Sequence, residues 1–301
     1  MIVIGGGPAG FTAALYGGRA DFSVLLIEEM VSGGQIASTA QVDNYPGFPD
    51  GIGGIELGQL LEKQARRFGA EVALTKAEEV KVSGNEKIVR TKDATYRGRS
   101  LVIASGTHPR LLKIPGEEDF KGRGVSYCAT CDGPFFRNKE VAVIGGGDAA
   151  VEEALFLTRF AQKVYIVHRR DQLRAVRTLA KRAIESPKIE MLWDTIPREI
   201  KGSNIVEELV VENIKTGAVK EIPVSGVFIY VGRIPNTSFL GKDLLELDEH
   251  GFILAGEDTM TSVPGIFAAG DVRTKKLRQI VTAAADGAVA ATAAGRYLAD
   301  N

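Results

Sequence analysis

The sequence MIVIGGGPAG at residues 1–10 recurs as VAVIGGGDAA at residues 141–150, and this repeat decides the fold. A shift of 140 residues places residues 1–28 on residues 141–168 without a gap, and ten of those 28 positions are identical. Each copy starts as a short apolar strand, passes through three glycines into a helical pattern and returns to an apolar strand. Strand, glycine turn, helix and strand within about 30 residues form a βαβ unit. The chain therefore contains two such units.

The glycine spacing is the one that a dinucleotide requires. The first copy reads Gly5-x-Gly7-x-x-Gly10, and the second reads Gly145-x-Gly147-x-x-Ala150. The first glycine permits a tight turn, the second lets the backbone approach a pyrophosphate, and the third position lets the helix pack on the strand. A single motif of this kind can mark a structural turn, but two in register favour nucleotide binding at the helix N-termini. The residues expected to contact the two nucleotides are Gly5, Gly7, Pro8, Ala9 and Gly10 in the first copy, and Gly145, Gly147, Asp148 and Ala149 in the second.

The residue at the end of the second strand differs between the copies. The first copy has Glu28, and a carboxylate at this position accepts the ribose hydroxyls of an unphosphorylated adenosine, as in FAD or NAD. The second copy has His168, followed by Arg169, Arg170 and Arg174. Cations at this position fit a 2′-phosphate that guanidinium groups hold. A solvated basic loop is the alternative, but we expect NADPH rather than NADH in the second unit.

Composition excludes several classes of function. Lys and Arg number 37 and Asp and Glu number 38, so the net charge of −1 offers no bulk attraction to nucleic acid or to an anionic membrane. No apolar run approaches the ~18 residues that a membrane span needs. The N-terminus also lacks the charged start and long apolar stretch of a signal peptide. We expect a soluble, cytoplasmic protein that has neither a nucleic-acid nor a membrane partner.

The only two cysteines form the sequence Cys128-Ala-Thr-Cys131. In a reducing compartment a lone CxxC is half of a metal site or a redox pair, and no second pair is present to complete four thiolates. The three histidines show no metal-ligand spacing, so we expect no metal. Asp132 is placed to exchange a proton with the attacking or leaving sulfur. The alternative for Asp132 is a turn or cap aspartate before Gly133.

The remaining pattern predicts that one domain is inserted into the other. Residues 238–301 number 64, too few for a third domain, and should complete one of the two units. We predict an α/β fold with two Rossmann-like, three-layer ββα dinucleotide-binding domains, the second inserted into the first. The other expected elements are a helix over residues 57–68, a strand at Leu101–Ala104, a helix near Gln172–Ser186, strands at Val227–Val231 and Ile266–Ala269, and a helix over Thr282–Arg296.

Taken together, the sequence resembles the bacterial-type, low-molecular-weight thioredoxin reductases. The resemblance covers essentially the whole chain and rests on the paired dinucleotide units, on CATCD at 128–132, on HRRDxxR at 168–174, and on GIFAAGD at 265–271 followed by Arg278-Gln279. Ser105 and Leu173 depart from the usual pattern but keep a hydroxyl and apolar bulk. The resemblance implies an FAD-binding domain of residues 1–110 and 237–301, an NADPH-binding domain of residues 111–236 that carries the CxxC, and a homodimer.

The resemblance also assigns further FAD contacts and a reaction. Asp271 is expected at the ribitol-phosphate, and Arg278, Gln279 and Ile280 against the flavin. NADPH would reduce FAD, FAD the Cys128–Cys131 disulfide, and the dithiol would reduce thioredoxin by exchange. Because disulfide and NADPH share one domain, we expect that domain to rotate on linkers near 107–114 and 232–237. The remaining expected FAD contacts are Gly34, Gln35, Asn44, Gly106 and Gly270.

Three alternatives remain open. The first is a related flavin disulfide reductase that reduces a peroxiredoxin or a small-molecule disulfide, or that takes its electrons from ferredoxin. The arginines at 169–174 argue against the ferredoxin-fed form, which does not need NADPH. The second is a flavin-based sensing module, against which the CxxC argues. The third is a structural protein that binds zinc.

Overall fold

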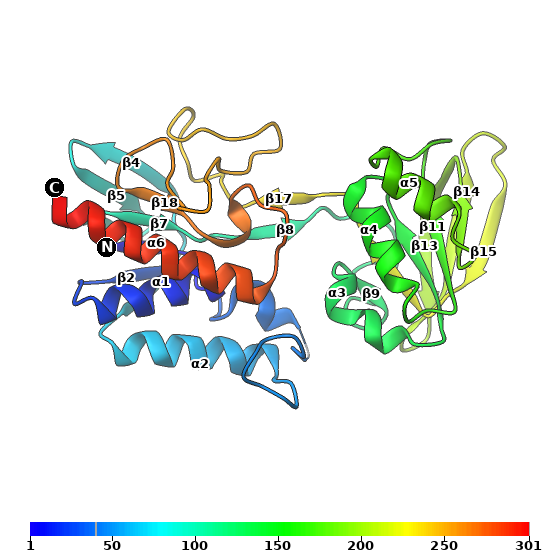
Figure 1. The fold of residues 1–301 in the computed structure, drawn as a ribbon, viewed down its shortest axis with the longest axis horizontal. Coiled ribbons are helices and arrows are strands. Elements are labelled where there is room, and N and C mark those ends of the chain that lie inside the picture. Colours follow the sequence, from blue (N-terminus) through cyan, green and yellow to red (C-terminus); the bar gives the residue numbers. More distant parts are fainter. Residues whose placement is uncertain (40, 301) are drawn as a thin grey trace. The chain divides into compact units, whose positions relative to one another are not determined.

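The computed structural model describes residues 1–39 and 41–300. The chain divides into two compact units, Met1–His108 with Arg233–Asn301, and Pro109–Gly232 (Figure 1). The chain leaves the first unit along β8 (Thr107–Pro109) and returns along β17 (Arg233–Pro235), and these two strands pair with each other. The second unit is therefore an insertion between two segments of the first.

The first unit is built on a five-stranded parallel sheet in the order β18-β7-β1-β2-β3. The central strands are apolar throughout because both faces of the sheet are covered. Alternate residues such as Val3 and Val102 point to helices, whereas Ile2 and Ile103 point to a three-stranded antiparallel sheet. The strands of the parallel sheet are β1 (Ile2–Ile4), β2 (Leu25–Glu28), β3 (Glu71–Leu74), β7 (Leu101–Ile103) and β18 (Ile266–Ala268). The covering elements are α1 (Pro8–Arg19), α2 (Gly54–Arg67), α6 (Ile280–Asp300), β4 (Glu79–Ser83), β5 (Glu86–Arg90) and β6 (Thr95–Gly98).

The C-terminal helix α6 lies beside α1, although the two are far apart in the sequence (Figure 1). Small residues make this close approach possible. A Cβ atom at Gly287 would collide with the carbonyl oxygen of Ala9 in the first turn of α1. The Ala- and Gly-rich composition of α6 therefore lets residues 280–300 pack directly behind the first glycine turn.

The second unit repeats the layers of the first. Its parallel sheet has the order β12-β11-β10-β16-β9, with helices on one face and an antiparallel sheet on the other. This repetition confirms the predicted pair of Rossmann-like ββα units. The strands of the parallel sheet are β9 (Val125–Ser126), β10 (Glu140–Ile144), β11 (Lys163–Val167), β12 (Ile189–Leu192) and β16 (Gly226–Ile229). The covering elements are α4 (Asp148–Leu157), α5 (Arg177–Ile184), β13 (Thr195–Gly202), β14 (Val206–Asn213) and β15 (Val219–Pro223).

Helix α5 begins later than the sequence predicts. The expected helix near Gln172–Ser186 starts only at Arg177. The N–H of Arg174 donates to the carbonyl of Gly146 at 2.7 Å, and the N–H of Val176 donates to Asp148 Oδ1 at 2.7 Å. These two bonds hold the chain against the second glycine turn, so residues 170–176 do not become helical.

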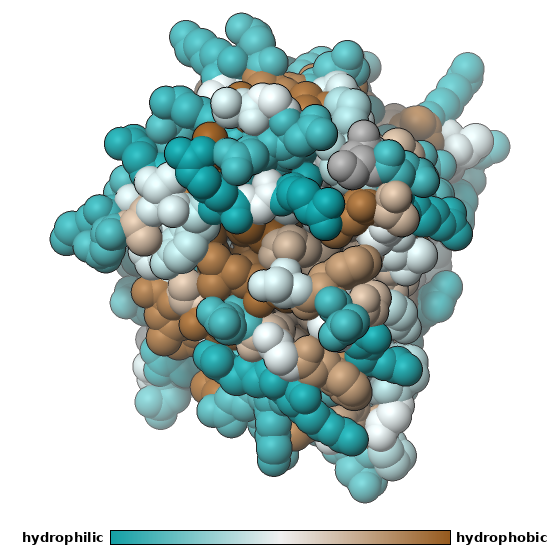
Figure 2. Space-filling model, turned by 90° about the vertical axis from the view of Figure 1, so that its left-hand side faces the viewer, coloured by the Kyte–Doolittle hydropathy of each residue, from teal (hydrophilic) through white to brown (hydrophobic). Residues whose placement is uncertain are grey.

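Short helical turns lie near the candidate site residues. They are η1 (Gly34–Ser38), α3 (Ala129–Asp132), η2 (Gly133–Phe136) and η3 (Gly270–Val272). Among the residues with a described placement, no helix has both the length and the apolar character that a membrane span requires. Figure 2 shows apolar side chains gathered in the middle of one face and framed by hydrophilic ones.

Candidate functional site

The first glycine turn has the geometry that a dinucleotide needs. Gly5 has a φ of +106°, and a Cβ atom at Gly10 would collide with the carbonyl of Gly5. At Gly7, in contrast, a Cβ atom would meet no atom closer than the carbonyl oxygen of Gly33, at an ordinary contact distance of 3.8 Å. Helix α1 begins at Pro8, whose missing N–H costs the helix nothing at this position. The remaining N–H groups of the first turn are thus available to a phosphate.

Glu28 lies beside this turn at the end of β2. Its carboxylate accepts the N–H of Gly6 at 2.5 Å and the N–H of Met30 at 2.9 Å. A carboxylate has about four lone-pair positions, so both oxygens can still accept a further hydrogen bond. Glu28 therefore supports the turn and retains acceptors for ribose hydroxyls.

Asp271 carries an unsatisfied buried oxygen. It follows β18 within η3, and its Oδ1 is buried with no hydrogen-bond partner among the described residues. Burial raises the pKa of Asp271, and the positive charges of Arg233 and Arg278 oppose that rise. A buried polar atom without a partner is costly unless a ligand satisfies it. A ribitol hydroxyl is a donor of the right kind, so this residue fits FAD.

Several other residues expected at FAD are joined by hydrogen bonds. Gln35 Nε2 donates to Thr107 Oγ1 at 3.4 Å, and Arg233 donates to Gln35 Oε1 at 2.6 Å. Asn44 Nδ2 donates to Gln279 Oε1 at 3.0 Å, across 235 residues of sequence. Thr107 and Arg233 were not among the predicted residues, and no local motif marks them.

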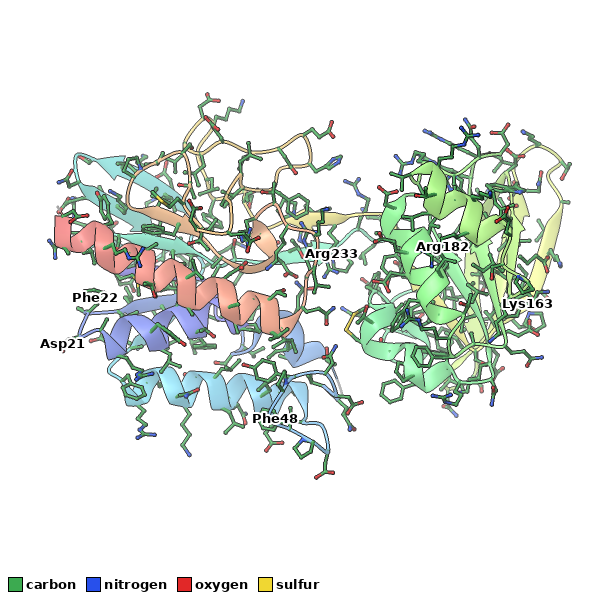
Figure 3. All side chains as sticks on the ribbon, in the orientation of Figure 1. Asp21, Phe22, Phe48, Lys163, Arg182 and Arg233 are labelled. Atoms are coloured by element: carbon green, nitrogen blue, oxygen red, sulfur yellow. A yellow bond between two sulfur atoms is a disulfide. The ribbon has the colours of Figure 1, made fainter. Side chains whose placement is uncertain are left out.

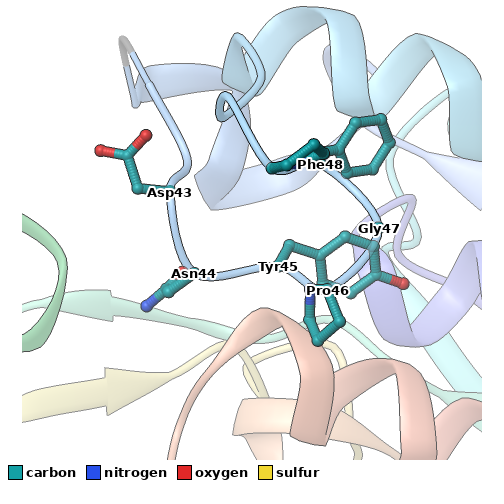
Figure 4. A pocket seen from close by; sticks show the side chains of 7 residues that line it. Asp43, Asn44, Tyr45, Pro46, Gly47 and Phe48 are labelled. Atoms are coloured by element: carbon teal, nitrogen blue, oxygen red, sulfur yellow. The ribbon is translucent and has the colours of Figure 1, made fainter.

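The loop that carries Asn44 borders a shallow, open hollow of about 570 Å³, lined by residues 43–49. The rings of Tyr45 and Phe48 stack with centroids 6.2 Å apart. Figure 4 shows these two rings on one side of the loop, with the side chain of Asn44 pointing away from them. The aromatic rings pack on each other, whereas Asn44 contacts Gln279.

The second glycine turn repeats the geometry of the first. Gly145 has a φ of +149°, and a Cβ atom there would lie 2.6 Å from the carbonyl oxygen of Tyr230. At Gly147 a Cβ atom would have only Arg174 Nη2 as a neighbour, at 4.0 Å. Helix α4 begins at Asp148, next to Ala149 in the same turn. The turn therefore offers open backbone and a nearby guanidinium to a phosphorylated ligand.

The four basic residues after β11 divide into a buried imidazole and exposed guanidiniums. His168 is buried against the backbone of Gly146, and its Nε2 has no partner among the described residues. Burial lowers the pKa of His168, and the neighbouring arginines lower it further, so the ring is neutral at pH 7. Arg169, Arg170 and Arg174 are exposed, and none forms an ion pair with a described residue. The arginines, rather than His168, supply the positive charge.

The two cysteines form a disulfide at the start of α3 (Figure 3). The N–H of Cys131 donates to Cys128 Sγ at 3.2 Å. The N–H of Ala129, which is fully buried, donates to the hydroxyl of Tyr230 at 2.6 Å. Tyr230 thus touches both the disulfide helix and the second glycine turn, and sequence reasoning missed it because no motif includes it.

Asp132 lies at the end of α3 and is held by a serine. Ser126 Oγ donates to Asp132 Oδ2 at 2.6 Å. Burial raises the pKa of Asp132, and the hydrogen bond from Ser126 opposes the rise. Between the cysteines, Thr130 Oγ1 donates to Glu153 at 3.4 Å, and burial also raises the pKa of Glu153. A half-buried carboxyl next to a disulfide suits proton exchange with sulfur.

The structure groups the predicted residues by unit. The first unit contains those expected at FAD, and the second contains those expected at NADPH together with the cysteine pair. No group of three or more possible metal ligands occurs among residues 1–39 and 41–300. Two glycine turns, a disulfide and an adjacent carboxyl define a class of enzyme that moves electrons between a nucleotide and a disulfide.

The chain belongs to the pyridine nucleotide-disulphide oxidoreductase family, whose model matches residues 1–287. Within that family it is similar to thioredoxin reductases along its whole length. It is 49% identical to the thioredoxin reductase of Listeria innocua, covering 99% of this chain and 93% of that protein. It is 46% identical to the thioredoxin reductase of Bacillus subtilis, covering 99% of this chain and 94% of that protein. The crystal structure of thioredoxin reductase from Streptococcus pyogenes is 47% identical, with a TM-score of 0.93 over 100% of this chain and 98% of that chain. The resemblance predicted from the sequence is thereby confirmed.

Proposed function

We propose that the chain is an NADPH-dependent thioredoxin-disulfide reductase that contains FAD. The observation that carries the proposal is the Cys128–Cys131 disulfide with the carboxyl of Asp132 nearby, in the same unit as a glycine turn flanked by arginines. Thioredoxin reductases that are 46–49% identical over nearly the whole chain support the same chemistry here.

We infer that FAD binds to the domain predicted as residues 1–110 and 237–301. The first turn of α1 would bind the pyrophosphate, Glu28 the ribose and Asp271 the ribitol chain. The open backbone at Gly7 and the unsatisfied Oδ1 of Asp271 support this assignment. When bound, FAD supplies a two-electron relay between the nicotinamide and the disulfide. Arg278, Gln279 and Ile280 would lie against the flavin, and the remaining residues proposed to contact FAD are Gly34, Gln35, Asn44, Gly106 and Gly270.

We infer that NADPH binds to residues 111–236. Gly145, Gly147 and the start of α4 would hold its pyrophosphate. Arg169, Arg170 and Arg174 would hold the 2′-phosphate through charge-assisted hydrogen bonds, which distinguishes NADPH from NADH. The exposed arginines and the open backbone at Gly147 support the proposal.

The residues of α3 would carry out the exchange with the partner. A thiolate of the reduced pair attacks the partner disulfide, forms a mixed disulfide and displaces one partner sulfur. The other cysteine then attacks the mixed disulfide, which releases the partner as a dithiol and restores the Cys128–Cys131 bond. Asp132 gives a proton to a leaving thiolate and later recovers one from a thiol. Two electrons and two protons pass to the partner in each cycle.

The partner we propose is thioredoxin, and the working form we propose is a cytoplasmic homodimer. Rotation of the second unit on its two linkers stays a prediction. A crosslink that fixes a single pose should block turnover, and full activity of the locked protein would contradict it.

A coupled assay of NADPH oxidation with thioredoxin tests the proposal. Cys128→Ser and Cys131→Ser should each abolish it, and turnover that survives both substitutions would remove the role of the pair. Mixing with NADPH alone should bleach the flavin absorbance, whereas an unchanged spectrum favours a sensing module. Activity with another disulfide but not with thioredoxin would indicate a related reductase with a different partner. Bound zinc in elemental analysis would instead support a structural metal site.

A further inference from the structure

Ser126 occupies a specific position between the cysteine pair and Asp132. It is the last residue of β9, pairs with Phe228 of β16 and is 5% exposed. Its Oγ donates to Asp132 Oδ2 at 2.6 Å and accepts the N–H of Cys128 at 3.1 Å. The hydroxyl therefore links the backbone of the first cysteine to the carboxyl group.

The carboxyl group of Asp132 depends on this one hydroxyl. Among the described residues, no other group donates a hydrogen bond to its side chain. Because the N–H of Cys128 already bonds to Oγ, the hydroxyl proton of Ser126 is directed away from it, toward Asp132. The carbonyl of Cys128 lies 3.4 Å from the same Oγ and offers the proton a second acceptor.

We propose that Ser126 is the positioning residue for Asp132: it fixes the carboxyl relative to Cys128 and stabilises its ionised form after the proton has gone to sulfur. When Asp132 is ionised, the hydroxyl of Ser126 donates to it. When Asp132 is protonated, the hydroxyl turns to the carbonyl of Cys128. The inference rests on the proposed acid/base role of Asp132, and no bond of Ser126 itself forms or breaks.

Other titratable groups near α3 face different atoms. Glu153, from α4, faces the hydroxyl of Thr130, and Tyr230, which follows β16, faces the N–H of Ala129. Tyr127, next to Cys128, donates to the buried Glu117. Burial raises the pKa of Asp132 and the hydrogen bond from Ser126 lowers it, and Asp132 forms no ion pair with a described residue. The effect of Ser126 is therefore not masked by a nearby ion pair.

The test compares Ser126→Ala with Ser126→Thr, which keeps the hydroxyl, in the holoprotein. Asp132→Asn shows which 13C signal and which part of the pH–rate profile belong to Asp132. Ser203→Ala is the matched control, because Ser203 also donates to a carboxylate, Glu207, at 2.7 Å, but on an exposed surface. Two quantities are measured against pH: the rate at which pre-reduced protein reduces thioredoxin, and the 13C shift of the Asp132 carboxyl carbon.

Loss of one hydrogen bond to an ionised carboxylate should raise the midpoint of both titrations by about one pH unit, since that bond changes proton affinity about tenfold. Ser126→Thr should restore the midpoint, and Ser203→Ala should not move it. A role in folding alone would lower the rate equally at every pH. An unmoved 13C midpoint in Ser126→Ala overturns the inference and leaves the proposed function intact. A 13C midpoint that moves while no part of the pH–rate profile depends on Asp132 overturns the acid/base role of Asp132 and, with it, the positioning role of Ser126. Loss of activity in the cysteine variants would still uphold the reductase.

Discussion

Replacing Asp286 by alanine should destabilise the first unit. The carboxylate of Asp286 accepts two hydrogen bonds from Arg273 and one from Lys275, each at 2.8 Å, and the N–H of Gly270 at 2.9 Å. Arg273 is 2% exposed, and the side chain of Lys275 is 7% exposed. Asp286→Ala leaves both cations buried without their main partner, and loss of one member of a buried ion pair costs about 3–5 kcal/mol.

The lower end of that range, about 3 kcal/mol, is the expected loss in the free energy of unfolding because some partners remain. Arg273 Nη1 still donates to the carbonyl of Ala255 at 3.2 Å, and Lys275 Nζ donates to that of Thr282 at 3.3 Å. Glu257 lies 3.8 Å from Arg273, but its side chain is 98% exposed and adds little.

Urea unfolding of the full holoprotein measures the effect with two probes. Release of flavin fluorescence reports the first unit, and the single tryptophan, Trp193, reports the second. Glu86→Ala is the control in the same unit, since Glu86 pairs with Arg97 on the surface, and it should cost at most ~1 kcal/mol. If the flavin transition of Asp286→Ala coincides with that of Glu86→Ala, the cluster does not stabilise the unit and the reasoning is refuted.

Acid should weaken the same cluster. Burial raises the pKa of Asp286, but the hydrogen bonds from Arg273 and Lys275 lower it by more, so the folded value is below the ordinary one. A carboxyl with a depressed folded pKa contributes stability above its unfolded pKa of ~3.9 and loses that contribution as pH falls through the folded value. The wild type should therefore lose stability below about pH 4 more steeply than Asp286→Ala does.

Three further substitutions test other parts of the two units. Arg174→Gln removes a charge-assisted hydrogen bond to the 2′-phosphate, so it should raise the KM for NADPH about tenfold or more and leave the KM for NADH unchanged. Equal effects on both nucleotides in steady-state kinetics would contradict the assignment of Arg174 to the 2′-phosphate. Tyr230→Phe leaves the buried N–H of Ala129 without its acceptor and should cost about 1–3 kcal/mol in the Trp193 transition, which a superimposable urea curve would exclude. Gly287→Ala brings a methyl group against the carbonyl of Ala9 and should lower the thermal midpoint of the first unit, whereas the exposed Gly241→Ala should not.

The layers of the fold could be predicted because they depend on local patterns that occur twice. The glycine turns and their strands follow from residue types within a few positions. The start of α5 could not be predicted in this way. Residues 172–176 have an acceptable helical pattern, but hydrogen bonds from Arg174 and Val176 to the glycine turn outweigh it. Those bonds join residues 28 positions apart and leave no local signal.

The site was predictable where a motif carries the chemistry, as at Cys128 and Cys131. Its supporting residues were not. Tyr230 reaches Ala129 across 101 positions, and Arg233 reaches Gln35 across 198. Ser126 is different, because it precedes Asp132 by only six positions. A serine just before a CxxC-Asp segment was a signal that sequence reasoning could have used.

The two copies share the same packing at the glycine turn but place their charged side chains differently. In both, the residue at the end of the second strand packs on the middle one of the three consecutive glycines. A Cβ atom at Gly6 would crowd Glu28, and one at Gly146 would collide with His168. In the first copy that residue is itself the charged group and bonds to the turn. In the second it is a neutral ring, and the charge has moved outward to arginines such as Arg174. Exchanging Glu28 for histidine alone would therefore remove a ribose acceptor without creating a phosphate site, and a change of nucleotide requires the neighbouring arginines as well.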